Sequence, residues 1–136
     1  MDGPSKRILL VDDDEDVRYL LGDLFAQEGY HVDEAADGLE AVAAMKKRRH
    51  DVVLCDYHMP RMDGLAFLDV SRIVWPNTPV IIASCDPEIG EHSMSRRVSS
   101  AYACLSKPFD LDQLLSVVRE AVGSTQTSSL HHTADR

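Results

Sequence analysis

The sequence predicts a three-layer α/β sandwich, with helices on both faces of a five-stranded parallel sheet. First, short apolar runs rich in β-branched residues alternate with longer amphipathic stretches along the 136-residue chain. Second, the apolar runs contain few polar residues, which is typical of parallel strands buried on both faces. Third, the length suits one domain with a core of its own. Strands that alternate with helices in this way are joined by right-handed crossovers.

The composition excludes several classes of protein. Apolar residues make up 44% of the chain and charged residues 27%, as in ordinary globular domains. The net charge of -9 argues against direct binding to nucleic acid or to an anionic membrane, because both need a basic surface. No apolar stretch approaches the roughly 20 residues of a membrane span, and the first residues do not form a signal peptide.

The three cysteines indicate the compartment. Cys55, Cys85 and Cys104 lie within or beside apolar runs and lack a metal-site spacing such as Cys-x-x-Cys. Buried free thiols are typical of a reducing environment. We therefore expect a cytoplasmic protein.

The first strand is predicted over residues 7–11, an apolar run that stops at three consecutive aspartates. A helix follows, because the next apolar residues recur at the spacing of one helical face. These residues are Val17, Leu20, Leu21, Leu24 and Phe25. Gly29 is a typical residue for ending this helix.

The next two elements are a weaker strand over residues 30–35 and an amphipathic helix that follows the turn at Asp37-Gly38. The helix ends in the basic cluster of residues 46–49. Cations at a helix C-terminus interact favourably with the helix dipole, so this cluster indicates a helix end more than a nucleic-acid site.

The central strand covers residues 52–55 and ends abruptly at Asp56. After a loop, residues 65–75 are predicted to form a helix that Pro76 ends, and residues 79–83 form the fourth strand. The helix expected over residues 88–98 is the weakest, because its apolar residues are sparse and it contains glycine and several serines.

The last strand covers residues 102–105. The final helix has one apolar stripe and is expected to end at Gly123. Its apolar residues are Leu111, Leu114, Leu115, Val118 and Val122. Residues 124–136 are rich in Ser and Thr and carry no pattern, so we expect a domain over residues 6–123 and a flexible tail over residues 124–136.

Polar residues with related chemistry follow the predicted strands. Because the carboxyl ends of parallel strands meet at one edge, this edge collects Asp12 and Asp13, Asp56, Ser84 and Lys107. Close carboxylates repel by roughly 4 kcal/mol per pair at an effective dielectric constant near 20. A hard divalent cation with oxygen ligands, Mg²⁺ above all, is the natural partner for them.

Asp56 alone could be an ordinary turn residue, but its expected neighbours indicate chemistry. Lys107 supplies a positive charge, and the Ser84 hydroxyl can donate to an incoming oxyanion. A metal ion, a lysine and a hydroxyl around one nucleophilic carboxylate make a site that accepts a phosphoryl group.

On these residues the chain resembles the receiver domain of bacterial two-component response regulators, of the chemotaxis-regulator type, over about residues 6–123. The residues that carry the resemblance are Asp12-Asp13, Asp37-Gly38, Glu40-Ala41, Asp56 with His58-Met59-Pro60 and Met62-Asp63-Gly64, Ser84, and Lys107-Pro108-Phe109. The resemblance implies a flavodoxin-like sheet of order 2-1-3-4-5, which places the site at a topological switch point.

The resemblance also implies the roles of the metal-site residues. Asp13 and Asp56 would ligate Mg²⁺ directly, Asp12 would help through water, and His58 would contribute its backbone carbonyl. A magnesium phosphatase of the haloacid dehalogenase type also uses a strand-end aspartate. That class needs a second aspartate two residues after the nucleophile, where this chain has His58.

For the phosphoryl group, the resemblance implies transfer to Asp56 from a phosphohistidine of a sensor histidine kinase or phosphotransfer protein. Lys107 would pair with the phosphoryl group, Ser84 would move onto it, and Lys107-Pro108 would be a cis peptide. The chain would be a signalling phospho-acceptor that promotes its own phosphorylation and dephosphorylation, not an enzyme. The alternative is a pseudo-receiver that serves only as a binding surface.

Partners follow from the same resemblance. The phosphorylated chain would switch conformation and signal to a downstream effector protein or domain. A homodimer would form through residues 88–98, 102–105 and 111–122. The chain departs from the family at Cys104, where a Tyr or Phe is usual, and at Cys85, where Ala or Gly is common. The departure at Cys104 concerns the aromatic conformational readout, whereas the larger Cys85 lies where the family leaves a path for the phosphodonor. Neither residue provides the nucleophile or a metal ligand, so phosphorylation should survive both changes.

Overall fold

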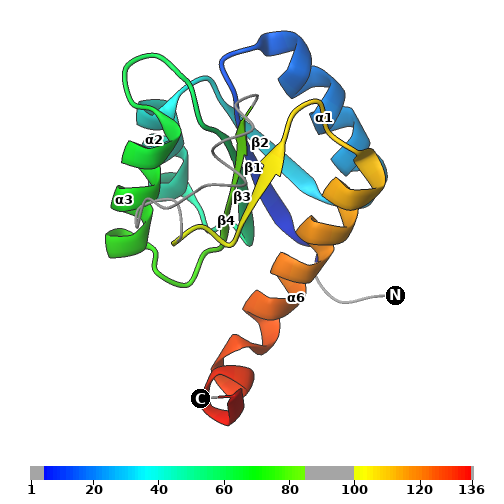
Figure 1. Ribbon diagram of the computed structural model, residues 1–136, viewed down its shortest axis with the longest axis vertical. Coiled ribbons are helices and arrows are strands. Elements are labelled where there is room, and N and C mark those ends of the chain that lie inside the picture. The colour runs from blue at the N-terminus through cyan, green and yellow to red at the C-terminus, as the bar shows by residue number, and fades with distance from the viewer. Residues whose placement is uncertain (1–4, 85–99, 136) are drawn as a thin grey trace.

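The computed structural model describes residues 5–84 and 100–135, with side chains described up to residue 123. Its centre is a parallel sheet of five strands in the order β2-β1-β3-β4-β5 (Figure 1). The strands are β1 (Arg7–Val11), β2 (His31–Ala35), β3 (Val52–Asp56), β4 (Val80–Ser84) and β5 (Ala103–Ser106). The predicted sheet and its order are confirmed.

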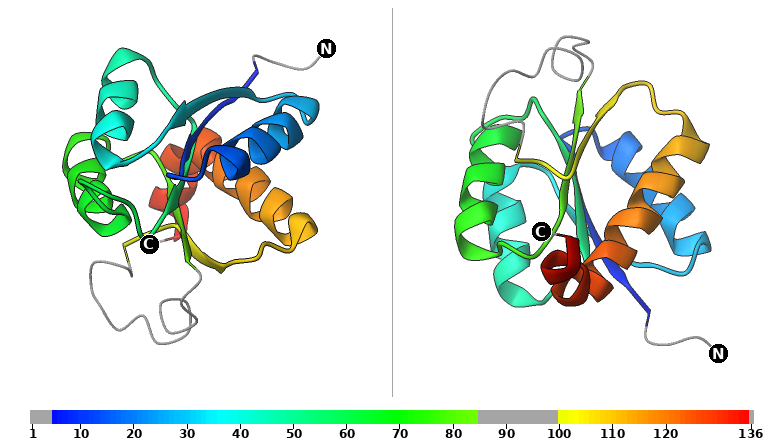
Figure 2. Two further views of the ribbon diagram at one scale, coloured as in Figure 1. Left: turned by 90° about the horizontal axis from the view of Figure 1, so that it is seen from above. Right: turned by 60° about the horizontal axis from the view of Figure 1, so that its bottom comes forward.

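Helices cover both faces of this sheet. Those in the described residues are α1 (Glu15–Gln27), α2 (Gly38–Lys47), α3 (Gly64–Val74) and α6 (Leu111–Asp135). Figure 2 shows α1 and α6 on one face and α2 and α3 on the other. This arrangement confirms the three-layer sandwich. The helix predicted over residues 88–98 lies outside the described residues.

Two apolar cores, one on each face, hold the strands in place. In β1, Ile8 and Leu10 pack into the core beneath α1 and α6, whereas Leu9 and Val11 pack into the core beneath α2 and α3. Successive side chains of a strand point to opposite faces, so a strand covered on both faces needs an unbroken apolar run. The same layering fixes the position of the residue that follows each strand.

Aspartates precede all four described helices at the edge of the sheet where the strands end, and Asp110 before α6 accepts Gln113 N–H at 3.2 Å. Asp14, Asp37 and Asp63 are the N-cap residues of α1, α2 and α3, and each side chain accepts a backbone N–H of the first turn. A side-chain oxygen at this position satisfies a donor that has no partner within the helix. The acidic character of this edge therefore comes partly from helix capping.

The predicted end of the last helix at Gly123 is wrong, because α6 continues to Asp135. A glycine inside a helix costs only about 1 kcal/mol relative to alanine, and extending a helix is far easier than starting one. The predicted stop at Gly29 is confirmed, since α1 ends at Gln27 and Gly29 has a φ of 97°. Residues 124–135 are thus helical, and the expected domain boundary and flexible tail both stay predictions.

None of the described helices, including the 25-residue α6, is both long and apolar enough to cross a membrane.

Candidate functional site

Three carboxylates gather at the carboxyl edge of the sheet. One oxygen each from Asp12, Asp13 and Asp56 lies within 4.8 Å of the other two. The register explains why they meet, because Val11 of β1 pairs with Cys55 of β3 and the next residue on each chain segment is an aspartate, Asp12 or Asp56. Asp12 is buried, Asp56 is half-buried and Asp13 is exposed. The cluster thus has a buried base and an open side.

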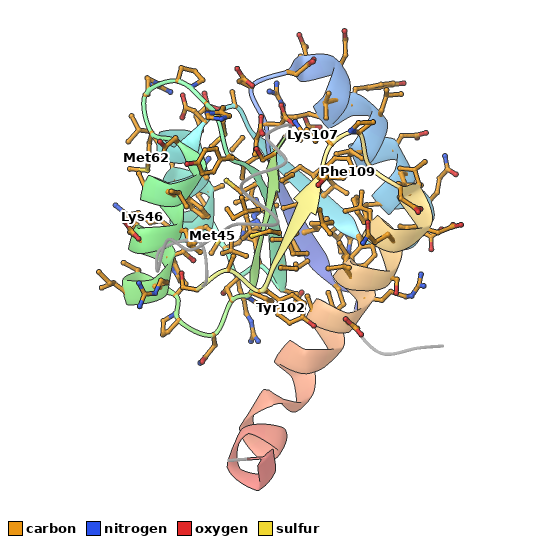
Figure 3. All side chains as sticks on the ribbon, in the orientation of Figure 1. Met45, Lys46, Met62, Tyr102, Lys107 and Phe109 are labelled. Carbon is orange, nitrogen blue, oxygen red and sulfur yellow. The ribbon has the colours of Figure 1, made fainter. Side chains whose placement is uncertain are left out.

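Lys107 reaches this cluster from the loop between β5 and α6. Its Nζ donates to Asp12 Oδ2 at 3.0 Å and lies 3.4 Å from Asp56 Oδ2. Its backbone N–H donates to the carbonyl oxygen of Ser84 at 2.9 Å, and its peptide bond to Pro108 is cis, as expected. Figure 3 shows Lys107 at the upper end of the sheet, close to Phe109.

The charges of the cluster do not balance. Burial raises the pKa of Asp56 above its usual value, and the charges of Asp12 and Asp13 raise it further against the opposing effect of Lys107. Burial alone would lower the pKa of Lys107, but Asp12 and Asp56 outweigh it and hold that pKa above its usual value. Lys107 therefore stays protonated, and the three carboxylates together still carry more negative charge than it can neutralise. Three oxygen ligands with an excess of negative charge fit a hard divalent cation such as Mg²⁺.

The loop after β1 is held by an arginine that sequence reasoning missed. Arg18 Nη1 donates to the carbonyl oxygen of Asp12 at 2.6 Å, and Arg18 Nε donates to Glu34 at 3.1 Å. Asp12 Oδ1 also accepts the backbone N–H of Asp14 at 2.9 Å. A cation in the first turn of a helix interacts unfavourably with the helix dipole. The position of Arg18 in the sequence could therefore have indicated that its side chain binds a partner outside the helix.

Ser84 ends β4 and is 2% exposed. The register pairs Asp56 with Ala83, so Ser84 lies one residue beyond the partner of Asp56 on the neighbouring strand. On its other side it pairs with Ser106, the residue before Lys107. The structure therefore places Ser84 at the same edge as the carboxylates. The sequence after it, including Cys85, lies outside the described residues.

Two backbone hydrogen bonds fix the loop after Asp56. Tyr57 N–H donates to the carbonyl oxygen of Ala83 at 2.8 Å, and Gly64 N–H donates to the carbonyl oxygen of Tyr57 at 2.9 Å. The exposed His58 ring packs edge to face on Tyr57, with 4.5 Å between the ring centroids. The His58 imidazole does not belong to the cluster of Asp12, Asp13 and Asp56. The backbone carbonyl of His58 stays a predicted ligand.

Cys104 is half-buried on β5, opposite Ile82, among the side chains of the core beneath α2 and α3. Burial raises the pKa of its thiol. Tyr102, two residues earlier on the chain, is 39% exposed. The position where the resemblance implies an aromatic ring therefore holds a small side chain.

The sequence of this chain is similar to those of known signalling regulators. Residues 8–119 match the response regulator receiver domain family. The chain is 35% identical over 116 residues to sporulation initiation phosphotransferase F of Bacillus subtilis, with 85% of this chain and 93% of that protein covered. It is also 37% identical over 116 residues to regulatory protein AtoC of Escherichia coli, of which it spans only 25%.

A solved structure supports the same comparison. The response regulator protein TrrA of Thermotoga maritima, in complex with Mg²⁺-BeF, aligns with a TM-score of 0.78 and 28% identity. The alignment covers 85% of this chain and 98% of that one. The chain is thus similar both to receiver proteins of about its own length and to one segment of longer regulators.

Proposed function

Because the chain belongs to the response regulator receiver domain family, we propose that it accepts a phosphoryl group on Asp56 and signals through two-component phosphotransfer. The observation that carries the proposal is the cluster at the edge of the sheet. Asp56 stands within 4.8 Å of two further carboxylates and 3.4 Å from the ammonium group of Lys107. This arrangement offers a nucleophile, a cation site and a fixed positive charge in one place.

In the proposed reaction, a carboxylate oxygen of Asp56 attacks the phosphorus of a phosphohistidine. The phosphorus–nitrogen bond breaks, its electron pair stays on the departing imidazole, and an acyl phosphate forms on Asp56. Asp12, Asp13 and Asp56, with the His58 carbonyl, would hold Mg²⁺, which would neutralise charge on the transferring phosphoryl oxygens. Acidic residues of this kind are the Mg²⁺ site of receiver domains.

Lys107 and Ser84 would receive the new phosphoryl oxygens. The Lys107 ammonium group is already within 3.4 Å of the acceptor oxygen, so a small side-chain movement brings it from Asp12 onto a phosphoryl oxygen. The Ser84 hydroxyl would donate to another oxygen from the neighbouring strand. Charge-assisted hydrogen bonds of this type are about twice as strong as neutral ones.

The proposed partners are a phosphodonor and an effector. The donor is a sensor histidine kinase or a phosphotransfer protein in the cytoplasm, and the output is a change of conformation read by an effector protein or domain. A homodimer through β5 and α6 stays a prediction, and its third expected element, residues 88–98, lies outside the described residues.

The first prediction tests the acceptor. With Mg²⁺ present, acetyl phosphate or a phosphorylated kinase domain should add one phosphoryl group to the wild type. Asp56→Asn should accept none because it lacks the nucleophile, and Asp13→Ala should accept at most a small fraction because the cation site is weakened. Intact-protein mass spectrometry measures the incorporation.

Two outcomes would contradict the proposal. Unchanged incorporation in Asp56→Asn would show that another residue is the acceptor. A wild type that accepts no phosphoryl group from either donor, with Mg²⁺ present, would identify a pseudo-receiver that acts only as a binding surface.

A further inference from the structure

The loop between β3 and α3 contains a strained turn. Arg61 has a φ of 65°, and Met62 N–H donates to the carbonyl oxygen of Pro60 at 2.7 Å. A hydrogen bond between residues two apart across a positive φ is the mark of a γ-turn, which is rare because it is strained. Such a conformation costs about 1–3 kcal/mol and persists only when surrounding contacts hold it.

An ion pair with a buried aspartate provides one of these contacts. Nε and Nη2 of Arg61 each lie 2.6 Å from Asp37 Oδ2, and the Asp37 side chain is 5% exposed. The other oxygen of Asp37 accepts Glu40 N–H at 2.9 Å and caps α2. Burial would raise the pKa of Asp37, but the hydrogen bonds from Glu40 N–H and Arg61 hold it below its usual value.

A backbone contact joins the same two loops. Gly38 N–H donates to the carbonyl oxygen of Met62 at 2.9 Å. A Cβ at Gly38 would lie only 2.6 Å from that oxygen, so the approach requires glycine. The strained turn is therefore seated against the start of α2 by the Arg61 side chain and by the Met62 carbonyl.

The other end of the same loop is packed against the acceptor. A Cβ at Gly64 would overlap the carbonyl oxygen of Asp56. Gly64 N–H also donates to the carbonyl oxygen of Tyr57, which ties the start of α3 to the residue after Asp56. Because these contacts are tight, a movement of the turn at residues 60–62 should also displace residues 56–58.

We propose that Arg61 is a positioning residue of the phosphorylation site. By pairing with Asp37 it holds the strained turn, and the turn holds the segment that supplies the acceptor carboxylate and the expected His58 carbonyl ligand. This inference rests on the proposed function, because it concerns the Mg²⁺ site of that reaction. Residues that orient metal ligands in this indirect way commonly change metal affinity when they are replaced.

Four variants separate the ion pair from the backbone conformation. Arg61→Ala removes the ion pair and disfavours the positive φ, whereas Arg61→Gly removes the ion pair and adopts a positive φ without strain. Arg61→Lys keeps the charge but loses the two-nitrogen contact. Arg72→Ala, at an exposed arginine on α3, is the matched control.

The measurement is the Mg²⁺ dissociation constant, obtained by calorimetry without a phosphodonor. We expect it to rise about tenfold in Arg61→Ala and Arg61→Gly, the lower end of the effect of residues that support metal ligands. The Mg²⁺ dissociation constant of Arg61→Lys should lie between those of these two variants and that of the wild type. The dissociation constant of Arg72→Ala should equal that of the wild type. In the Mg²⁺-free protein, amide exchange of residues 57–63 should be faster in Arg61→Ala and Arg61→Gly.

A double-mutant cycle identifies the partner. Asp37→Asn keeps an oxygen that can cap α2 but removes the charge that Arg61 contacts. It should weaken Mg²⁺ binding about as much as Arg61→Ala, and the double variant should be no weaker than either alone, because both remove the same interaction.

Other results overturn the inference. An unchanged Mg²⁺ dissociation constant with a lower unfolding free energy would make Arg61 purely structural, and fully additive effects would separate it from Asp37. A wild type that binds no Mg²⁺ would also overturn it. The proposed function is judged separately by phosphoryl incorporation, so wild-type protein that binds Mg²⁺ but accepts no phosphoryl group contradicts that function alone.

Discussion

Asp33 on the edge strand β2 contacts two arginines and a buried histidine. It accepts a hydrogen bond from the buried His50 Nε2 at 2.8 Å, and Arg7 Nη1 and Arg48 Nε lie 3.4 Å and 3.8 Å from it. His50 is 2% exposed, and its Nδ1 has no hydrogen-bond partner among the described residues. The carboxylate of Asp33 therefore provides the hydrogen-bond partner of a buried imidazole whose other nitrogen has none among the described residues.

The pH dependence of stability should report this contact. Burial would raise the pKa of Asp33, but the hydrogen bond from His50 and the charges of His50, Arg7 and Arg48 hold it below its usual value. For an acid with a lowered pKa in the folded state, the stabilisation is complete above the unfolded value of 3.8 and is lost as the pH falls through the folded value. Asp33→Asn should thus lower the unfolding free energy by about 1–2 kcal/mol at pH 7.

Thermal unfolding of both proteins between pH 7 and about pH 2.5 checks this prediction. The difference between wild type and Asp33→Asn should shrink as the pH falls, because protonated aspartic acid and asparagine are both neutral. A difference that stays constant at every pH would mean that the charge of Asp33 does not contribute.

At single residues, the sequence predicted contacts that follow from strand ends and missed those between loops. Asp12, Asp13 and Asp56 meet as expected because the order of parallel strands places them together. The contact of Arg61 with Asp37 depends on a positive φ at a residue other than glycine, which no residue pattern encodes. The turn at Asp37-Gly38 was recognised, but its partner loop was not.

Among the elements, strand positions were predicted to within one residue. The run at residues 79–83 became β4 at Val80–Ser84, and the run at residues 102–105 became β5 at Ala103–Ser106. Fully buried strands have sharp limits because the apolar run ends where the chain leaves the core. The length of α6 was not predictable in this way, because its last residues have no apolar stripe to mark where it ends.

The continuation of α6 gives the next prediction. A Cβ at Gly123 would meet no atom within 4 Å, and Gly123 does not have a positive φ. Gly123→Ala should therefore raise the unfolding free energy by about 1 kcal/mol, the difference in helix propensity between the two residues. Thermal unfolding and the helical signal in circular dichroism measure the effect.

Gly38→Ala is the opposing control for this helix prediction. Its Cβ would lie 2.6 Å from the carbonyl oxygen of Met62, so the loop must move and the protein should lose stability. If Gly123→Ala instead lowers the melting temperature, the helix ends at Gly123 as the sequence pattern indicated. That result would support the predicted boundary before residue 124.

At the scale of the whole molecule, the alternation of strands and helices was enough to predict the architecture. A parallel sheet covered on both faces is the arrangement that buries every unbroken apolar run of this chain, and the two observed cores do so. The same architecture concentrates negative charge. With a net charge of -9 and three carboxylates within 4.8 Å at one edge, the fold contains a repulsive cluster that the apolar cores must hold together.

Mg²⁺ should consequently stabilise the entire domain. A cation that binds the assembled cluster, and not the unfolded chain, raises the unfolding free energy by about 1.4 kcal/mol at ten times its dissociation constant. Asp56→Asn removes one of the three charges, so without Mg²⁺ we expect it to be more stable than the wild type by about 0.5–2 kcal/mol. Mg²⁺ should raise the unfolding free energy of Asp56→Asn by less than that of the wild type, because one proposed Mg²⁺ ligand is lost.

Thermal unfolding with and without Mg²⁺, at matched ionic strength, separates specific binding from screening of the net charge. Sodium chloride weakens the repulsion among all exposed carboxylates, and this effect should be nearly the same in wild type and Asp13→Ala, which differ by one exposed carboxylate. The additional rise produced by Mg²⁺ should be large in the wild type and mostly absent in Asp13→Ala, which lacks the exposed member of the cluster. Equal rises in both proteins would mean that Mg²⁺ acts only as a screening salt, and the carboxylates at this edge would then have no specific cation.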